Sequence, residues 1–343
     1  MIRIQNIYYM LAYAFQVLHE QGYKDVATED FENTAELLSA ILCRGVSVQI
    51  KRGLCRQYIT NEEPLGSPRG KIEIGESIKT QAIRKKQLVC AYDEFSVDAY
   101  TNRIIKTTME LLLRANISKT RKKEIRKLLI FFDGVSVLDT HSINWDIQYD
   151  RNNQTYRMII EVCHLVIKGL LQTSADGSTR IMDYADDQTM AKLYEKFILG
   201  YFQREHTDIK AYSPQIAWQV TDGYRTLLPT MQSDIVISHK KTKKTLIIDA
   251  KYYSHNMQMK APYMTQTLHS GNLYQIFTYV KNWNAAPDET ISGMLLYART
   301  DDAIQPDNDY QMSGNQISVK TLDLNCEFAV IAAQLDAIAD SIK

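Results

Sequence analysis

The chain has 343 residues, of which 45% are hydrophobic and 23% are charged, and its 40 basic and 40 acidic side chains give a formal net charge of zero. This length exceeds what one hydrophobic core usually organises, so two domains are expected. The composition excludes a disordered chain. The neutral charge excludes a strong overall positive field for nucleic acid, so targeting is expected to come from a partner.

The cysteines and the apolar segments indicate the cellular compartment in which the protein is expected. The five cysteines are scattered without CxxC spacing, so neither a zinc site nor a disulfide framework is indicated and reduced thiols are expected. The apolar start of the chain is interrupted by Gln5 and Asn6, and no other stretch approaches the ~20 apolar residues that a bilayer requires. We therefore expect a cytoplasmic protein with no signal peptide and no membrane partner.

The first half of the chain combines helical and strand-like patterns. Apolar residues recur at helical spacing over residues 4–18 and 30–50, which predicts two packed helices. From Gly45 onward the pattern changes to alternation, and together with the turn-rich segment 61–70 this predicts a small β-rich unit. Helices are predicted again over residues 98–115 and 119–132. The second begins with a run of lysines and arginines, which is more typical of a solvated face than of a nucleic-acid site.

The second half has an α/β pattern. A polar segment over residues 139–154 predicts the connection between two domains, residues 1–150 and 151–343. Beyond it, helices are predicted over residues 155–173, 187–204 and 271–284. Strands are predicted over residues 215–221, 225–230, 233–238, 244–249 and 291–298. The fold class is therefore α/β, or α+β overall, with an N-terminal domain that is helical and carries the small β-rich unit.

The segment with the clearest chemical pattern is 233–253, where a lysine-rich turn joins two apolar strands that should pair as a hairpin. In an antiparallel pair, Asp234 at the start of the first strand and Asp249 at the end of the second meet at the same edge. Alternation places Lys251 on the same face as Asp249, with Ala250 pointing away. The sequence therefore predicts that two carboxylates and one amine converge.

This arrangement suits metal-dependent hydrolysis. Two close carboxylates repel each other unless a cation lies between them, and carboxylate oxygens suit Mg²⁺. The metal would bind phosphate oxygens and help to generate hydroxide, while Lys251 would orient or deprotonate the water and offset developing charge. We predict Asp234, Asp249 and Ala250 as the metal-binding positions. A plainer explanation stays open, in which Asp249 and Lys251 end an edge strand as a solvated ion pair.

Further motifs resemble a known nuclease superfamily. Asp234, fourteen intervening residues and Asp249-Ala250-Lys251, with Glu195 on an upstream helix and the QxxxY of Gln275 and Tyr279 downstream, resemble the PD-(D/E)xK nucleases. Over essentially the whole chain there is a closer similarity to the nuclease subunits of McrBC modification-dependent restriction systems. It is carried by IxNIYYMLAYAF from Ile4, PRGKI from Pro68, Asp98-x3-Asn102-Arg103, LYEKF from Leu193, DAKYY from Asp249 and LYQIFTYV from Leu273.

The resemblance implies a C-terminal PD-(D/E)xK nuclease fold, a mixed central sheet flanked by helices, with Asp234, Asp249 and Lys251 as catalytic residues. It implies a Mg²⁺-dependent endonuclease that cleaves double-stranded DNA containing methylated cytosine in complex with a McrB-like partner, a hexameric AAA+ GTPase. The N-terminal domain would dock on that ring and stimulate GTP hydrolysis. GTP would be bound by the partner, since this chain has no GxxxxGK[ST] segment. One departure is Ser233, which stands where a proline often precedes the first acid.

Three further residues are predicted to be catalytic. Glu195 could reach the metal or its water, or could be an exposed helical partner of Lys192 or Lys196. Gln275 and Tyr279 lie one helical turn apart and can both face the site, where they would hold a DNA strand or support Lys251. The alternative for this pair is a surface glutamine and a core tyrosine.

Two other functions remain open. The chain could be a catalytically inert module that only stimulates the partner's GTPase, although the complete Asp, Asp, Lys set argues against decay of the site. It could also be a stand-alone nuclease of the RecB type that acts on free DNA ends, although the large N-terminal half would then lack a purpose.

Overall fold

The computed structural model describes residues 2–15, 31, 33–149, 154–176, 187–260 and 265–343. They form two compact units, one made of Met1–Leu37 with Gln172–Lys343 and the other of Leu38–Leu171. The divisions after residues 37 and 171 correct the boundary predicted near residue 150. The start of the chain belongs with the C-terminal unit because helix α1 (Ile4–Ala14) packs along helix α8 (Asp187–Glu205).

The contact between α1 and α8 depends on close backbone approach. A Cβ atom at Gly200 would lie 2.3 Å from the main-chain oxygen of Tyr13, so only glycine fits this crossing. The Tyr13 hydroxyl donates a hydrogen bond of 2.9 Å to Glu205, and Asn6 donates bonds of 2.8 Å to the carbonyls of Leu324 and Cys326. The N-terminal helix is therefore an integral part of the C-terminal unit.

The unit Leu38–Leu171 is built from helices and a three-stranded hairpin arm. Most of helix α3 (Thr34–Arg52) lies in it, followed by β1 (Gln57–Leu65), β2 (Lys71–Ile72), α4 (Ile74–Lys79), η1 (Ala82–Lys85), β3 (Leu88–Ser96), α5 (Tyr100–Arg114), α6 (Lys119–Leu129), η2 (Ile130–Phe132), η3 (Gln154–Tyr156) and most of α7 (Arg157–Asp176).

The strand-like alternation predicted from Gly45 is wrong, because α3 continues to Arg52. Leu38, Leu42 and Val46 are all fully buried at intervals of four residues, so helical burial prevails there.

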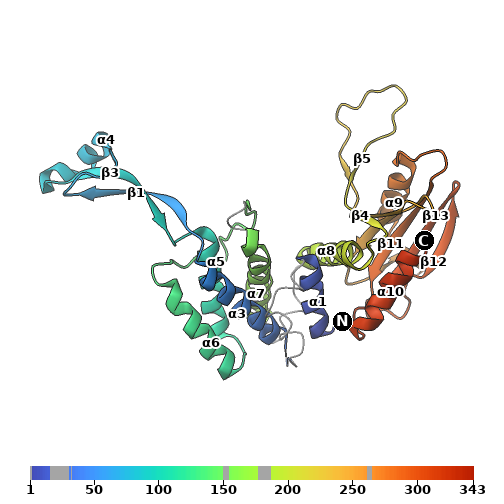
Figure 1. The fold of residues 1–343 in the computed structure, drawn as a ribbon, viewed down its shortest axis with the longest axis horizontal. Helices are drawn as coiled ribbons and strands as arrows, with labels where there is room; N and C mark the ends of the chain where they lie inside the picture. Colours follow the sequence, from blue (N-terminus) through green and yellow to red (C-terminus); the bar gives the residue numbers. More distant parts are fainter. Residues whose placement is uncertain (1, 16–30, 32, 150–153, 177–186, 261–264) are drawn as a thin grey trace. The chain divides into compact units, whose positions relative to one another are not determined.

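The β-rich part predicted in this half is an arm rather than a packed domain. Strand β1 pairs antiparallel with β3 from Gln57↔Ser96 to Leu65↔Leu88, and β2 pairs with the other side of β3. Figure 1 shows the hairpin extending from the helices of this unit, with α4 at its far end. Most side chains of β1 and β3 are exposed or half-buried.

The other unit is centred on a six-stranded sheet in the order β12-β13-β11-β8-β7-β4. Strand β11 runs parallel to β8 and β13, and the remaining pairs are antiparallel. The sheet is therefore mixed, as predicted. Its strands and neighbouring elements are β4 (Lys210–Tyr212), β5 (Gln215–Ile216), β6 (Met231–Gln232), β7 (Ile235–His239), β8 (Lys244–Lys251), β9 (Met257–Lys260), β10 (Thr265–Leu268), α9 (Ser270–Asn282), β11 (Thr290–Ala298), β12 (Asn308–Met312), β13 (Asn315–Leu322) and α10 (Phe328–Asp340).

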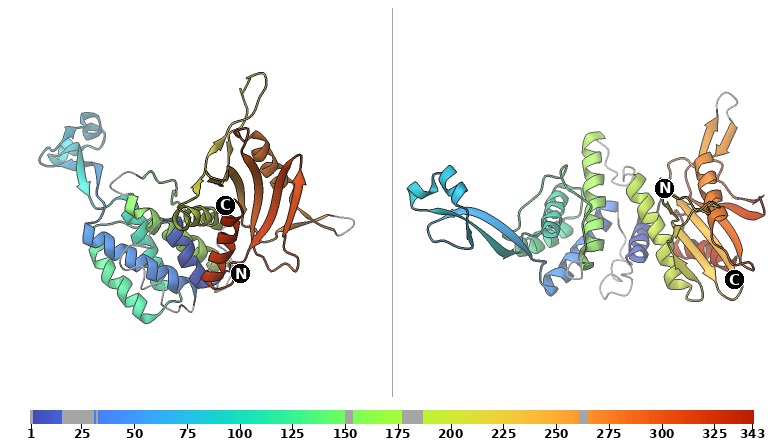
Figure 2. Two further views of the ribbon diagram at one scale, coloured as in Figure 1. Left: turned by 45° about the vertical axis from the view of Figure 1, so that its right-hand side comes forward. Right: turned by 90° about the horizontal axis from the view of Figure 1, so that it is seen from above.

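Helices cover both faces of this sheet (Figure 2). On one face α9 packs against a core that includes Val236, Ile247, Leu295 and Tyr297. Its approach to β11 is so close that a Cβ at Gly293 would lie 2.8 Å from Val280. Helices α8 and α10 lie on the other face, and α1 packs on α8.

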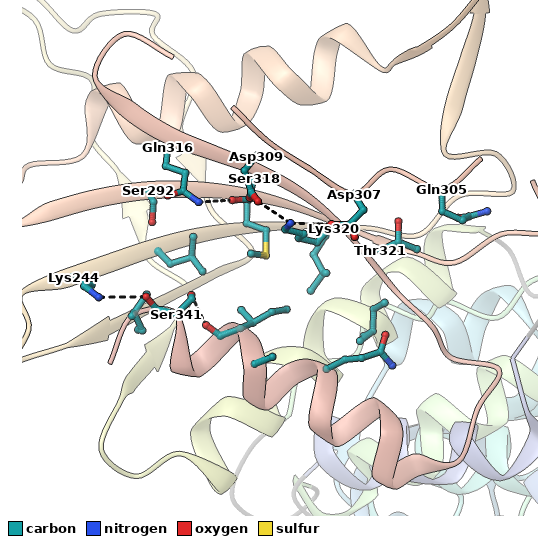
Figure 3. A pocket seen from close by; sticks show the side chains of 18 of the residues that line it. Lys244, Ser292, Gln305, Asp307, Asp309, Gln316, Ser318, Lys320, Thr321 and Ser341 are labelled. Atoms are coloured by element: carbon teal, nitrogen blue, oxygen red, sulfur yellow. Dashed lines mark hydrogen bonds and ion pairs between the residues drawn. The ribbon is translucent and has the colours of Figure 1, made fainter. Parts of the chain in front are cut away.

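The face covered by α10 also carries a groove of about 1110 Å³ between this helix and strands β8, β11, β12 and β13 (Figure 3). Lys244, Leu246, Met294 and Ile338 are among the residues that line it. Alternation along β8 directs Asp249 to the opposite face from Leu246, so the groove is separate from the predicted site.

Two predicted strands are shortened or absent. Residues 225–230 form no strand, and of 215–221 only Gln215–Ile216 is extended and paired. All ten residues from 221 to 230 are exposed, so no sheet covers them. Among the helices that the structure describes, none combines the length and apolarity needed to cross a bilayer.

Candidate active site

The hairpin predicted around the acidic residues is confirmed. Strands β7 and β8 pair antiparallel, with Ile235 opposite Ile248, so Asp234 and Asp249 are the next residues at the same end. The apolar run of residues 246–248 is buried in the sheet and brings Asp249, itself 0% exposed, into the interior. Because Asp249 lies on a buried strand, this position argues against the plainer explanation of a solvated ion pair at the end of an edge strand.

The three predicted central residues converge. Lys251 Nζ lies 2.8 Å from Asp249 Oδ2, so both side chains are on one face of β8 as alternation predicted. The main-chain N–H of Ala250 donates a hydrogen bond of 2.9 Å to Asp234 Oδ2 and fixes that carboxylate against β8. Ala250 thus holds a predicted ligand in place through its N–H. The catalytic and metal-binding roles of these residues stay predictions.

The two carboxylates are in an environment that disfavours their charge. Burial raises the pKa of Asp249 to about 7 despite the attraction of Lys251, and burial also raises the pKa of Asp234. Burial alone would lower the pKa of Lys251, but the adjacent Asp249 and Asp234 carboxylates outweigh it and raise the pKa. Both oxygens of Asp249 are buried; Lys251 is the only described donor near Oδ2, and Oδ1 has no donor among the described residues. A hard cation between Asp234 and Asp249 would satisfy these oxygens.

Glu195 on α8 lies beside this pair. Burial raises its pKa to about 7, and the negative charge of Asp234 adds to the increase, while Lys251, Lys192 and Lys196 oppose it. Glu195 is half-buried and within electrostatic reach of the site, so it is more than an exposed partner of neighbouring lysines. In the part of the chain that the structure describes, however, no three acidic, histidine or cysteine side chains meet at metal-ligand distances.

The predicted QxxxY pair supports Lys251 directly. Lys251 Nζ donates a hydrogen bond of 3.2 Å to Gln275 Oε1, and Gln275 Nε2 donates one of 2.8 Å to the Tyr279 hydroxyl. That hydroxyl in turn donates a bond of 2.9 Å to the main-chain oxygen of Gln232. A continuous series of hydrogen bonds therefore runs from the lysine through α9 to the segment that precedes Asp234.

A second group behind the site was not found from the sequence. The Tyr253 hydroxyl donates a 3.2 Å hydrogen bond to Asn272 Oδ1, and Asn272 Nδ2 donates one of 3.0 Å to the Tyr297 hydroxyl. Tyr297 pairs with Lys251 across the parallel strands β11 and β8, and burial raises its pKa to about 12, with a smaller contribution from Asp249. Asn272 lies three residues before Gln275, which is the local signal that could have revealed it.

The decisive comparison is with protein families. A sequence model described as McrBC 5-methylcytosine restriction system component matches residues 4–298. The chain belongs to this McrBC family. The matched range includes α1, the hairpin arm, the β7–β8 hairpin and α9, and thus every residue of the candidate site.

The printed names of one relative and of two solved structures agree with this family. "Type IV methyl-directed restriction enzyme EcoKMcrBC" of Escherichia coli (strain K12) is 30% identical over 347 residues, covering 99% of this chain and 97% of the relative. Two solved structures are from Thermococcus gammatolerans. A half-complex of McrB AAA+ hexamers with bound McrC has a TM-score of 0.48 at 18% identity, covering 99% of this chain and 76% of that chain. A McrBC complex has a TM-score of 0.40 at 20% identity, covering 59% and 58%. These two structural similarities are too low to support an inference.

Proposed function

We propose that this chain is the DNA-cleaving subunit of a modification-dependent restriction complex. On this proposal it hydrolyses phosphodiester bonds of double-stranded DNA that contains methylated cytosine, with Mg²⁺, when assembled with a McrB-like AAA+ GTPase hexamer. The observation that carries the proposal is Asp249, a fully buried carboxylate whose Oδ1 has no hydrogen-bond donor among the described residues, while Lys251 Nζ lies 2.8 Å from its Oδ2 and a second acid is adjacent. Buried charges without hydrogen bonds are costly and concentrate at functional sites.

The donor set fits a divalent cation. Asp234 and Asp249 offer carboxylate oxygens at one end of the β7–β8 hairpin, and Asp249 Oδ1 has no described donor to satisfy it. Once bound there, the cation would polarise the scissile phosphate and lower the pKa of an attacking water. Glu195 adds a further acid at the rim, where it can accept a hydrogen bond from that water.

Lys251 has a positional and electrostatic task on this proposal. Its ammonium is held between Asp249 Oδ2 and Gln275 Oε1 at 2.8 and 3.2 Å, and its third N–H remains available for water or phosphate. The raised pKa keeps the group charged near neutral pH, so Lys251 offsets negative charge that develops on the phosphate. This assigns orientation and charge stabilisation to the lysine in preference to proton abstraction.

The partner-binding role is assigned to the unit Leu38–Leu171. At the far end of its arm, Ile74 and Ile78 lie one turn apart on α4 and are 65% and 63% exposed, and Ile83 on η1 is 52% exposed. A cluster of exposed isoleucines is typical of a surface that binds another protein. We assign this end of the arm to contact with the GTPase and to stimulation of its GTP hydrolysis.

The test is a reconstituted reaction. The purified chain is mixed with the cognate AAA+ partner, GTP, Mg²⁺ and either methylated or unmethylated plasmid, and cleavage is followed on gels. Cleavage of methylated plasmid alone is expected, and Asp249→Asn should abolish it while assembly persists. Asp288→Asn, which alters an exposed aspartate of the same unit, is the matched control and should cut normally.

The alternatives give different results in the same assay. An inert regulatory module would stimulate the GTPase without cutting under any condition. A stand-alone nuclease would digest linear DNA without the partner. Either outcome, or cleavage by the Asp249→Asn variant, would refute the proposal.

A further inference from the structure

A long loop between β5 and β6 stands next to the candidate site. It spans residues 217–230, and every residue from 221 to 230 is exposed. Figure 1 shows it projecting well beyond the sheet from the position labelled β5. The ten consecutive exposed residues do not pack against a core; the tip is shaped by its own turn hydrogen bonds, from the Tyr224 N–H to Asp222 Oδ1 at 3.0 Å and from the Leu228 N–H to the Arg225 main-chain oxygen at 3.3 Å.

The base of the loop is held firmly. The Trp218 indole donates a hydrogen bond of 2.6 Å to the main-chain oxygen of Pro229, which closes the loop, and its ring packs against the core under α9. The Gln219 N–H donates a bond of 2.8 Å to Asn282 Oδ1 at the end of α9. The loop is therefore a supported projection, positioned by the same helix that carries Gln275 and Tyr279.

The loop is also continuous with the site. Its return strand β6 ends at Gln232, whose carbonyl accepts the Tyr279 hydrogen bond, and Asp234 follows two residues later. The strand from which the loop returns therefore ends two residues from Asp234.

The tip of the loop presents apolar side chains to solvent. Leu227 is 95% exposed and Tyr224 is 67% exposed, with Arg225 between them in sequence. Leu227 also has a φ of 67°, a left-handed conformation that a residue with a branched side chain rarely adopts. Strained backbone combined with exposed apolar side chains is typical of contact surfaces.

We propose that this loop inserts into a groove of the DNA duplex, with Leu227 and Tyr224 as a wedge and Arg225 on the phosphate backbone. The inference rests on the proposed function, because that function supplies the ligand at Asp234 and Asp249. Apolar wedges that part base steps and arginines that bind phosphates are recurrent in proteins that bend DNA. Bending would bring the scissile phosphate of a stiff duplex down to a buried carboxylate pair.

Photocrosslinking tests which molecule the tip contacts. Benzoylphenylalanine replaces Leu227 in the full chain, which is assembled with its partner, GTP and methylated duplex and then irradiated. The expected product is a covalent adduct with DNA. The matched control carries the probe in place of Val330, which is 50% exposed on α10 on the other face of the sheet, and should give no DNA adduct. An adduct with the partner or with a second copy in place of DNA, or no adduct, would overturn the inference.

Substitution tests the contribution of the wedge. Leu227→Ser combined with Tyr224→Ser should weaken binding of a methylated duplex at least tenfold in the Asp249→Asn background, where DNA stays intact. Thr226→Ser within the same loop is the control and should bind normally. GTPase stimulation should be unchanged in both, which reports that the chain is folded and assembled. Equal DNA binding by all three proteins would refute the wedge.

Failure of the two proposals can be told apart. If the chain with the probe at position 227 crosslinks to DNA but the wild-type chain never cleaves it, the proposed function fails and the wedge stands. If the wild-type chain cleaves, and the two loop substitutions leave binding unchanged in the Asp249→Asn background and cleavage unchanged when Asp249 is present, the wedge fails and the proposed function stands.

Discussion

The hydroxyl of Tyr279 donates a hydrogen bond of 2.9 Å to the main-chain oxygen of Gln232, two residues before Asp234. This contact joins α9 to β6, the strand that ends two residues before the first acid. The same hydroxyl accepts a bond of 2.8 Å from Gln275, which holds Lys251. Tyr279 therefore couples the position of one carboxylate to the position of the amine, although it is two hydrogen bonds away from the amine.

Replacing Tyr279 by phenylalanine should slow DNA cleavage by about fivefold, because loss of hydrogen bonds worth ~1 kcal/mol leaves the Gln275 amide and Lys251 less well placed. The effect should appear in the cleavage rate at saturating DNA, with GTPase stimulation of the partner unchanged. Tyr274→Phe, which removes an exposed hydroxyl from the same helix, is the control. Equal rates for the two variants would contradict the positioning role.

Addition of Mg²⁺ should raise the thermal stability of the chain, because a ligand that binds only the folded state stabilises it, by about 1–3 kcal/mol near saturation. The gain comes from relieving the repulsion between two buried carboxylates and from coordinating the Asp249 oxygen that has no described donor. Differential scanning calorimetry with Mg²⁺ and with EDTA measures it. The increase should vanish in Asp249→Asn and persist in Asp288→Asn, and a shift of the same size in both would show that the ion binds elsewhere.

The local parts of the site were predictable from the sequence, and the long-range parts were not. Asp234 and Asp249 could be placed together because a short turn between apolar strands fixes the register of a hairpin. A strand was predicted over residues 225–230, yet a strand also needs a neighbour, and among the described residues no strand pairs with this segment. Tyr297 reaches Lys251 through a parallel pairing of distant strands, which no local pattern reveals.

The end of the hairpin arm offers a test of partner binding. Ile78→Asp should strongly reduce stimulation of the partner's GTPase, because a charge would replace an apolar contact in the proposed interface. Stability should change by no more than about 0.5 kcal/mol, since Ile78 is 63% exposed. Val137→Asp, at a residue 51% exposed elsewhere in the same unit, is the control. Full stimulation by the Ile78 variant would exclude this surface.

The attachment of the arm depends on Asn102, a fully buried residue of α5. Its Nδ2 donates hydrogen bonds of 2.8 Å to the carbonyls of Cys55, just before β1, and Val97, just after β3, so one side chain joins both ends of the arm. Asn102→Ala would leave two carbonyls without their donor and should cost ~2 kcal/mol.

The effect of Asn102→Ala should be local, because the lost bonds hold the arm and no other element. Amide hydrogen exchange should become faster at residues 57–60 and 93–96, and GTPase stimulation should fall because the arm is no longer held in one direction. Asn61→Ala removes only an exposed hydrogen bond within the arm and serves as the control. Wild-type exchange at both ends of the arm in the Asn102 variant would show that the hairpin itself, and not its attachment, sets the rigidity of the arm.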